Sequence, residues 1–211
     1  MRRIALVIAF TLAVSQLSVA AGAADMRYRV CLDPGHGGTD PGAIRGTLVE
    51  KELTLDIAQR VTGQLDATQY IVTLTRTDNA TTLGNSARAV ICNAAGAQVV
   101  LSIHLNASSD STPDYFWAFY GKPTKDKALA ATIDQHYRIT KPDSAELLPH
   151  KAITNFANGT LLKSNAPAAL AECLFMSNTR EQELLVATDA TSRRQQIANE
   201  LAKGIVAFAR P

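Results

Sequence analysis

The chain has 211 residues, of which 46% are hydrophobic and 19% charged, so it is long enough for one domain with a substantial core. This is not the composition of a disordered chain. A formal net charge of only +2 excludes a strongly basic surface of the kind that binds polyanions, so nucleic acid is not an expected partner.

The first segment, residues 1–23, has the pattern of a signal peptide. Arg2 and Arg3 form a basic start, a mostly apolar run follows, and residues 21–23 (Ala-Gly-Ala) offer the small-x-small pattern that a signal peptidase accepts. The alternative is a single membrane anchor. The apolar run is short for a membrane span and is interrupted by polar residues, so export with cleavage is the favoured interpretation.

Cleavage would leave residues 24–211 as the mature domain. It would remove two arginines and no acidic residue, which leaves 19 basic against 19 acidic side chains. We therefore expect a formally neutral, monomeric protein that is exported to the periplasm, the cell wall or the extracellular space. No membrane anchor is expected after cleavage.

The first half of the mature domain alternates strands and helices. Apolar residues recur with strand or helix spacing, which predicts strands at 28–33, 70–75 and 98–105 and helices at 50–66 and 83–95. The order strand, helix, strand, helix, strand predicts an α/β fold with a mostly parallel, twisted sheet flanked by helices.

The second half is less regular. It predicts an aromatic strand at 115–120, a helix at 125–139, a short strand at 159–163, a buried strand at 167–175 and two closing helices. Residues 142–156 show no clear pattern. Because no repeat or linker interrupts the chain, a single domain is expected.

Three cysteines, Cys31, Cys92 and Cys173, permit at most one disulfide. Exported proteins usually pair their thiols, so one bridge remains possible. The three residues are far apart in the sequence and each has apolar neighbours. We therefore expect them to be small buried hydrophobic side chains.

Two histidines are predicted at one edge of the sheet. His36 lies in a loop rich in Gly and Pro after the first strand, and His104 ends the strand at 98–105. Ligands gather at the carboxyl ends of strands in such sheets, so both imidazoles should meet there. Glu50 opens the first helix, after a flexible loop. Two imidazoles and one carboxylate suit Zn²⁺ with one position left for water.

A lone carboxylate, Glu172, interrupts the buried strand at 167–175. Burial of a carboxylate is costly unless the group is paired or functional. One interpretation is a structural ion pair with Arg76 or Arg88. Beside a metal site, the carboxylate can instead take a proton from water and return it to a leaving group, as metal-assisted amide hydrolysis requires.

Five segments together resemble a known family. They are 32–43 (LDPGHGGTDPGA), 50–58 (EKELTLDIA), 74–78 (LTRTD), 102–107 (SIHLNA) and 172–178 (ECLFMSN). In this order they resemble the zinc-dependent N-acetylmuramoyl-L-alanine amidases of the third amidase type, and the resemblance extends over residues 27–210.

The resemblance implies a mixed sheet with surrounding helices and a catalytic domain at 24–211. It implies one Zn²⁺ on His36, Glu50 and His104, with Glu172 as the catalytic acid and base. The substrate would be peptidoglycan or muropeptides, cleaved at the amide between the lactyl group of N-acetylmuramic acid and L-alanine.

Further residues are candidates for supporting roles. Asn106 is a candidate substrate contact, and Asp33, Asp40 and Asn106 are candidates for orienting the histidines. His136 and His150 are expected to face solvent.

Two features limit the comparison with the family. His150-Lys151 stands where family members often have an Arg-Gly pair. The interval from Asn106 to Glu172 looks too short for the inserted helix that plugs the zinc site in some relatives, so a site open without activation is expected.

Two alternative functions remain. The first is a zinc peptidase that cuts within the stem peptide. The second is a non-catalytic protein that binds wall fragments, although a pure binding protein has no use for the buried base Glu172.

Overall fold

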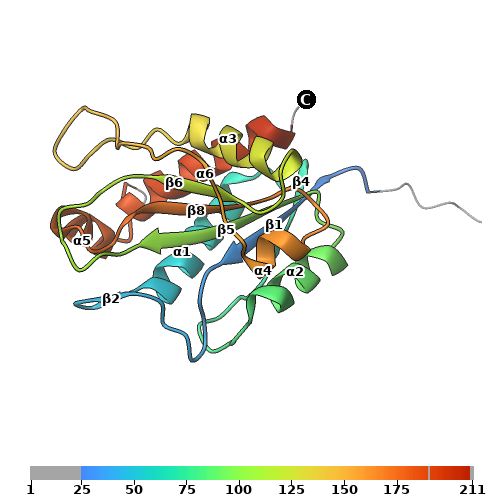
Figure 1. The fold of residues 1–211 in the computed structure, drawn as a ribbon, viewed down its shortest axis with the longest axis horizontal. Coiled ribbons are helices and arrows are strands. Elements are labelled where there is room, and N and C mark those ends of the chain that lie inside the picture. Colours follow the sequence, from blue (N-terminus) through green and yellow to red (C-terminus); the bar gives the residue numbers. More distant parts are fainter. Residues whose placement is uncertain (1–24, 190, 210–211) are drawn as a thin grey trace, which may run out of the picture.

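The computed structural model of the chain describes residues 25–189 and 191–209. The predicted signal peptide at 1–23 and its cleavage site lie outside the described residues. Figure 1 shows one layered α/β domain in which helices pack on both sides of a central sheet.

The elements follow the predicted alternation. The strands are β1 (Tyr28–Pro34), β2 (Ile44–Arg45), β3 (Leu48–Val49), β4 (Tyr70–Leu74), β5 (Val99–Asn106), β6 (Trp117–Tyr120), β7 (Thr154–Asn155) and β8 (Ala168–Phe175). The helices are α1 (Glu50–Gln64), α2 (Asn85–Ala94), α3 (Lys125–His136), α4 (Gly159–Lys163), α5 (Thr179–Val186) and α6 (Arg193–Ala209).

The main sheet has the strand order β4-β1-β5-β8-β6-β7. Strands β4, β1, β5 and β8 are mutually parallel, and β6 is antiparallel to β8, so the sheet is mixed but mostly parallel, as predicted. β2 and β3 form a separate antiparallel ribbon. The long apolar runs of β5 and β8 are explained by their central positions, because both faces of a central strand are covered.

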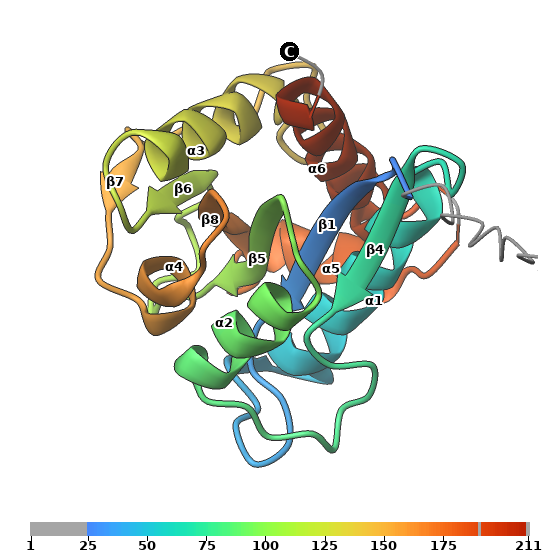
Figure 2. The same cartoon turned by 90° about the vertical axis from the view of Figure 1, so that its right-hand side faces the viewer.

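Two layers of helices enclose this sheet. Helices α1 and α3 each pack against α6. α1 also packs against β1 and β5, and α3 against β6 and β8, so the three helices enclose the larger hydrophobic core. Helices α2 and α4 lie side by side on the other face, as Figures 1 and 2 show, over a smaller apolar cluster.

Strand register places the predicted catalytic groups in one row. His104 of β5 is the register partner of Glu172 of β8, and Glu172 is in turn opposite Trp117 of β6. Register partners point to the same face of a sheet. The imidazole of His104 and the carboxylate of Glu172 are therefore neighbours on the face that carries α2 and α4.

The prediction of a strand at 159–163 was wrong, because these residues form helix α4. The side chain of Asn158 accepts a hydrogen bond from the backbone N–H of Thr160, which caps the amino end of the helix. Such a cap satisfies a backbone donor that a helix end otherwise leaves unpaired. The local cap decides the structure of this short apolar segment.

The interpretation of the cysteines as unpaired, buried side chains was wrong for Cys31 and Cys92 and was confirmed for Cys173. Cys31 of β1 and Cys92 of α2 form a disulfide with a Cα–Cα distance of 5.5 Å, whereas Cys173 is buried and free. The two partners are 61 residues apart in sequence, but α2 packs directly over β1. Sequence separation therefore gave no indication of the contact.

No helix in the described ranges 25–189 and 191–209 combines the length and apolarity that a membrane crossing needs.

Reduction of the disulfide should destabilise the domain. Opening a link between residues 61 apart gives the unfolded chain more conformational freedom, so dithiothreitol should lower the free energy of unfolding by about 2–4 kcal/mol. Urea denaturation with and without dithiothreitol measures this change. The double variant Cys31→Ala/Cys92→Ala is the control, because its stability should not respond to dithiothreitol. Equal stability of the oxidised and fully reduced wild-type protein would contradict the prediction.

Candidate active site

Two buried arginines shape the loop that carries His36. Arg88 donates hydrogen bonds to the carbonyl oxygens of Pro34 (2.8 Å) and His36 (2.6 Å). Arg76 donates to the carbonyl oxygens of Pro34 (3.1 Å) and Gly35 (2.8 Å). Three successive carbonyl groups are thus held by two guanidinium groups. Within this loop His36 adopts φ 61°, a left-handed conformation that costs energy for a residue with a Cβ.

The carboxylate of Asp33 anchors this arrangement at the end of β1. It accepts hydrogen bonds from Thr75 (2.6 Å), Ser102 (2.7 Å) and Arg88 (2.8 Å). These partners come from three different elements, so Asp33 ties the ends of neighbouring strands to α2. Asp33 contacts neither imidazole, and the expectation that it orients a histidine directly was wrong.

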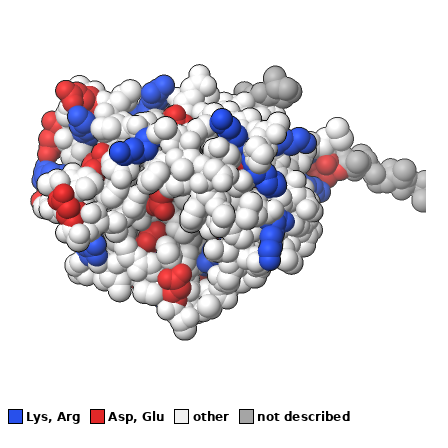
Figure 3. Space-filling model, in the orientation of Figure 1, with Lys and Arg blue, Asp and Glu red and all other residues white. Residues whose placement is uncertain are grey.

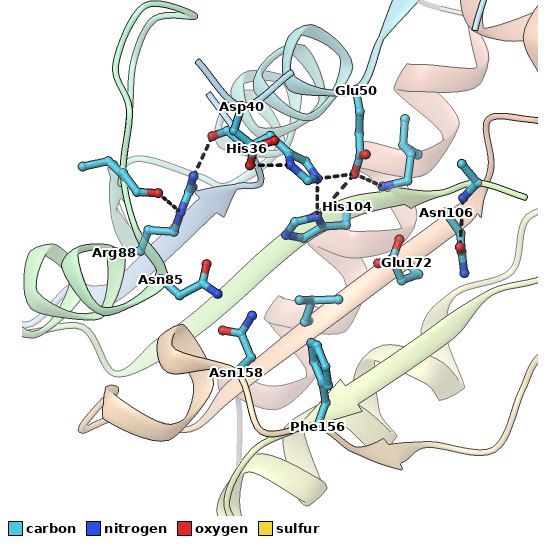
Figure 4. Close-up of a pocket in the computed structure, with 14 residues that line it drawn as sticks. His36, Asp40, Glu50, Asn85, Arg88, His104, Asn106, Phe156, Asn158 and Glu172 are labelled. Carbon is cyan, nitrogen blue, oxygen red and sulfur yellow. Dashed lines mark hydrogen bonds and ion pairs between the residues drawn. The ribbon is translucent and has the colours of Figure 1, made fainter. Parts of the chain in front are cut away.

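The imidazole of His36 has its two nitrogens in different environments. Its Nδ1 lies 2.9 Å from a carboxylate oxygen of Asp40, as expected for an orienting partner. Its Nε2 lies 3.0 Å from Glu50 Oε1 and 3.2 Å from His104 Nδ1. Figure 4 shows His36, Glu50 and His104 pointing toward one another. A proton on Nδ1, held by Asp40, leaves the Nε2 lone pair free to face this cluster.

Glu50 is fixed at the start of α1. One carboxylate oxygen accepts the backbone N–H of Ala43 (2.9 Å), and the other accepts the backbone N–H of Leu105 (3.1 Å). The second oxygen also lies 3.3 Å from His104 Nδ1. The Gly-rich loop before α1 thus brings the carboxylate of Glu50 back to His36 and His104.

The ligand atoms of His36, Glu50 and His104 lie within 4.8 Å of one another, so the three residues could hold a metal ion. Two glycines make this approach possible. A Cβ on Gly35 would lie 2.3 Å from the ring of His104, and a Cβ on Gly42 would lie 2.6 Å from the carboxylate of Glu50. Two imidazoles and one carboxylate are a donor set suited to a divalent cation such as Zn²⁺.

Without a cation, this cluster retains a proton. Burial alone would lower the pKa of His36, but hydrogen bonds and negative charge from Glu50 and Asp40 outweigh burial and raise that pKa from 6.5 to about 9. Burial would raise the pKa of Glu50, but the hydrogen bonds and charges of His104 and His36 hold that pKa far below its ordinary value. Opposite charges thus stabilise each other in the cluster.

Glu172 lies beside this cluster and lines the same cavity. Among the described residues, its Oε2 is a buried oxygen with no hydrogen bond. Burial raises the pKa of Glu172 to about 7, and the neighbouring charges of His104 and Glu50 act in opposite directions. The alternative of an ion pair with Arg76 or Arg88 was wrong, because both guanidinium groups are occupied at the loop of His36.

The cluster and Glu172 line a cavity of about 430 Å³. Its lining is His36, Asp40, Glu50, Leu83, Asn85, Arg88, His104, Leu105, Asn106, Ala107, Phe156, Asn158, Leu170 and Glu172. Figure 3 shows acidic side chains within a hollow of this face. Asn106 lines the cavity, and its side-chain oxygen accepts the backbone N–H of Ala107. A contact between Asn106 and substrate stays a prediction.

Sequence analysis missed Asn85, Phe156 and Asn158 as cavity residues. Phe156 ends the stretch that had no recognisable pattern, and the other two mark the starts of helices. An Asn followed by Gly-Thr at 158–160 is a helix-cap signal, but it carries no information on what the residue faces.

The expectation that His150 faces solvent was wrong. Its Nδ1 lies 2.8 Å from an oxygen of Asp134, and its ring packs against Phe116 with a centroid distance of 5.1 Å. His136 is half-buried, with its Nδ1 2.9 Å from the carbonyl oxygen of Thr132. Neither histidine lines the cavity.

The described residues between Asn106 and Glu172 form β6, α3, β7 and α4, and no residue of α3 lines the cavity. The imidazoles of His36 and His104 retain 22% and 17% of their side-chain exposure. Solvent therefore reaches both rings in this structure. Independence from an activator stays a prediction.

The fold and the cluster define an α/β domain with a candidate metal centre and an unpaired carboxylate beside it, the arrangement of a metal-assisted hydrolase. The sequence pattern of the N-acetylmuramoyl-L-alanine amidase family Amidase_3 matches residues 30–207. The chain belongs to this family and is an N-acetylmuramoyl-L-alanine amidase.

Individual relatives agree with this assignment. The chain is 33% identical to the germination-specific N-acetylmuramoyl-L-alanine amidase of Bacillus subtilis, over 85% of this chain and 78% of that protein. It is 32% identical to N-acetylmuramoyl-L-alanine amidase LytC of the same species, over 82% of this chain but only 33% of LytC. The crystal structure of the amidase from Clostridium difficile 630 superposes with a TM-score of 0.76 at 28% identity, covering 87% of this chain and 97% of that one.

Zinc affinity should rise steeply with pH. Because the pKa of His36 is about 9 in the metal-free protein, a proton must leave this ring before its nitrogen can bind a cation. The affinity for Zn²⁺ should therefore increase about tenfold per pH unit from pH 6 to about pH 9 and then level off. Competition with a chromophoric chelator at several pH values measures this dependence.

The variant Asp40→Asn provides the matched control. Loss of this negative charge lowers the pKa of His36, so the pH at which the affinity for Zn²⁺ levels off should be lower than in the wild-type protein. A pH-independent affinity of the wild-type protein over this range would contradict the prediction.

Proposed function

We propose that this amidase is an exported zinc enzyme that hydrolyses the amide between N-acetylmuramic acid and L-alanine in peptidoglycan. His36, Glu50 and His104 hold the metal, and Glu172 is the general base and acid. The observation that carries the proposal is the convergence of three ligand atoms within 4.8 Å, next to a buried carboxylate oxygen that has no partner among the described residues.

The reaction needs a nucleophilic water, polarisation of the amide carbonyl and a proton for the leaving amine. Zn²⁺ bound at the cluster supplies Lewis-acid polarisation and lowers the pKa of a water molecule toward ~7. The carboxylate of Glu172 accepts a proton from the attacking water and then donates it to the departing amine of L-alanine. In the metal-free protein, burial raises the pKa of this carboxyl group to about 7, so Glu172 can hold a proton as well as release one near neutral pH.

Other residues prepare the ligands for this chemistry. Asp40 holds the proton of His36 on Nδ1 and thereby presents Nε2 to the metal. The backbone N–H groups of Ala43 and Leu105 fix the carboxylate of Glu50. These contacts exist before the metal binds, so little reorganisation accompanies metal binding.

Export is part of the proposal and rests on the pattern of residues 1–23. The disulfide between Cys31 and Cys92 supports it, because such bonds persist in oxidising compartments outside the cytosol. We propose that the mature protein acts in the periplasm or cell wall as a monomer without a membrane anchor, where peptidoglycan is accessible.

Two alternative functions, a peptidase and a non-catalytic binding protein, fit the chain less well. Membership of the amidase family favours the lactyl amide over peptide bonds within the stem. An unpaired, buried carboxylate over the cluster favours catalysis over simple binding of wall fragments.

The products of digestion test this function directly. Purified sacculi and soluble muropeptides should release peptides that begin with L-alanine, together with intact glycan, and a strong chelator should stop the release. Mass spectrometry of the products identifies the cleaved bond. Cleavage between two residues of the stem peptide would contradict the proposal and favour a peptidase.

Replacement of Glu172 tests whether this residue is the general base or a metal ligand. Glu172→Gln should keep zinc at one ion per chain and lower kcat by about 10²–10⁴-fold, because proton transfer is lost while the metal ligands remain. The matched control is Glu52→Gln, which changes an exposed glutamate on α1 and should leave kcat unchanged. Elemental analysis and the muropeptide assay measure both quantities. Loss of zinc from Glu172→Gln would mean that Glu172 is a ligand.

A further inference from the structure

One side of the cavity is lined by an exposed aromatic residue, Phe156, whose backbone is held by hydrogen bonds. Phe156 lines the cavity together with Glu172 and is 45% exposed. Its backbone N–H donates to the carbonyl of Tyr120 (2.9 Å), and its carbonyl accepts from the N–H of Asn158 (2.9 Å). A large apolar ring held open to solvent by a fixed backbone is typical of a binding surface.

The ring of Phe156 continues an apolar surface that leads to the catalytic row. It packs against Phe119 of β6, with a centroid distance of 5.4 Å. Phe119 is the register partner of Leu170, which also lines the cavity and lies two residues before Glu172 on the same face of β8. The apolar surface therefore extends from the rim of the cavity to the carboxylate.

The amide side chains of Asn85 and Asn158 line the same side of the cavity as Phe156. Asn85 begins α2 and Asn158 caps α4, and the two helix ends are joined by a hydrogen bond from Thr160 Oγ1 to the carbonyl of Asn85 (3.1 Å). The side-chain oxygen of Asn158 is used by the cap. In the part of the chain that the structure describes, no protein group bonds the Asn85 amide or the Asn158 NH₂. Figure 4 shows both amides turned into the cavity.

We propose that Phe156, Leu170, Asn85 and Asn158, here called the sugar wall, bind the N-acetylmuramoyl ring of the substrate. A pyranose ring has an apolar C–H face, which suits an aromatic ring, and a rim of hydroxyl and acetamido groups, which suits amides. The stem peptide carries carboxylates, and the four side chains of the wall offer them no positive charge. The inference rests on the proposed function, because it assigns the acyl side of that substrate to this part of the cavity.

Inhibition by the two products tests the assignment. The zinc-loaded enzyme is assayed on a soluble disaccharide-peptide in the presence of the disaccharide N-acetylglucosaminyl-N-acetylmuramic acid, or of the free stem peptide. Phe156→Ala should weaken inhibition by the disaccharide about fivefold and leave inhibition by the peptide unchanged. Phe156→Tyr keeps the ring and should restore inhibition by the disaccharide.

The matched control is Leu162→Ala. Leu162 is 46% exposed on α4 but does not line the cavity, so its loss should change neither inhibition constant. Asn85→Ala tests the polar part of the wall and should also weaken inhibition by the disaccharide alone. Thermal melting curves establish that each variant is folded.

Several outcomes would overturn the inference. They are unchanged inhibition by the disaccharide in Phe156→Ala, a change confined to the peptide, an equal change for both products, and no inhibition of the wild-type enzyme by the disaccharide. Any of these results with normal cleavage by the wild-type enzyme rejects only the sugar wall. Failure of the wild-type enzyme to cleave the lactyl amide rejects the proposed function itself.

Discussion

The geometry of the site depends on one buried ion pair, between Asp33 at the end of β1 and Arg88 on α2. The two charged groups are 2.8 Å apart, and both side chains are almost completely buried. A buried guanidinium must satisfy all of its donors, and a lost partner would leave an uncompensated charge in the interior. The remaining donors of Arg88 find acceptors in the carbonyl groups of Pro34 and His36. The hydrogen bonds that Arg88 donates therefore stabilise the left-handed backbone that directs His36 toward Glu50 and His104.

Glu50 and Glu172 lie in the same site, but their different surroundings shift the pKa values of the two carboxyl groups in opposite directions. Glu50 accepts two backbone hydrogen bonds and faces two imidazoles, which keeps it ionised and suited to bind a cation. Glu172 instead has a buried oxygen that accepts no hydrogen bond from the described residues, and burial raises its pKa to about 7. The proposed metal ligand and the proposed base are thus distinguished by the hydrogen bonds that their carboxylates receive.

Sequence patterns predicted what depends on periodicity and strand direction. The apolar run before His104 indicated a central parallel strand, and the carboxyl ends of such strands meet at one edge, which brought His36 and His104 together. Features that depend on a single local or distant contact were not predictable in this way. The cap at Asn158 turned an apolar segment into a helix, and the packing of α2 over β1 formed a disulfide between cysteines with no recognisable spacing. The exposed ring of Phe156 also escaped prediction, because its surroundings are assembled from β6, β7 and β8.

Helix α2 connects these features, because it contributes to three of them. Arg88 holds the loop of His36, Asn85 belongs to the proposed sugar wall, and Cys92 is bonded to Cys31 in the strand that leads into the loop. The disulfide and the Asp33–Arg88 pair attach the same helix to the same strand at two points. Two attachments restrict rotation as well as translation of a short helix, which a single contact cannot do. The cluster of His36, Glu50 and His104 and the opposite side of the cavity are thereby held in a fixed relation, which suits the proposed placement of a scissile amide between them.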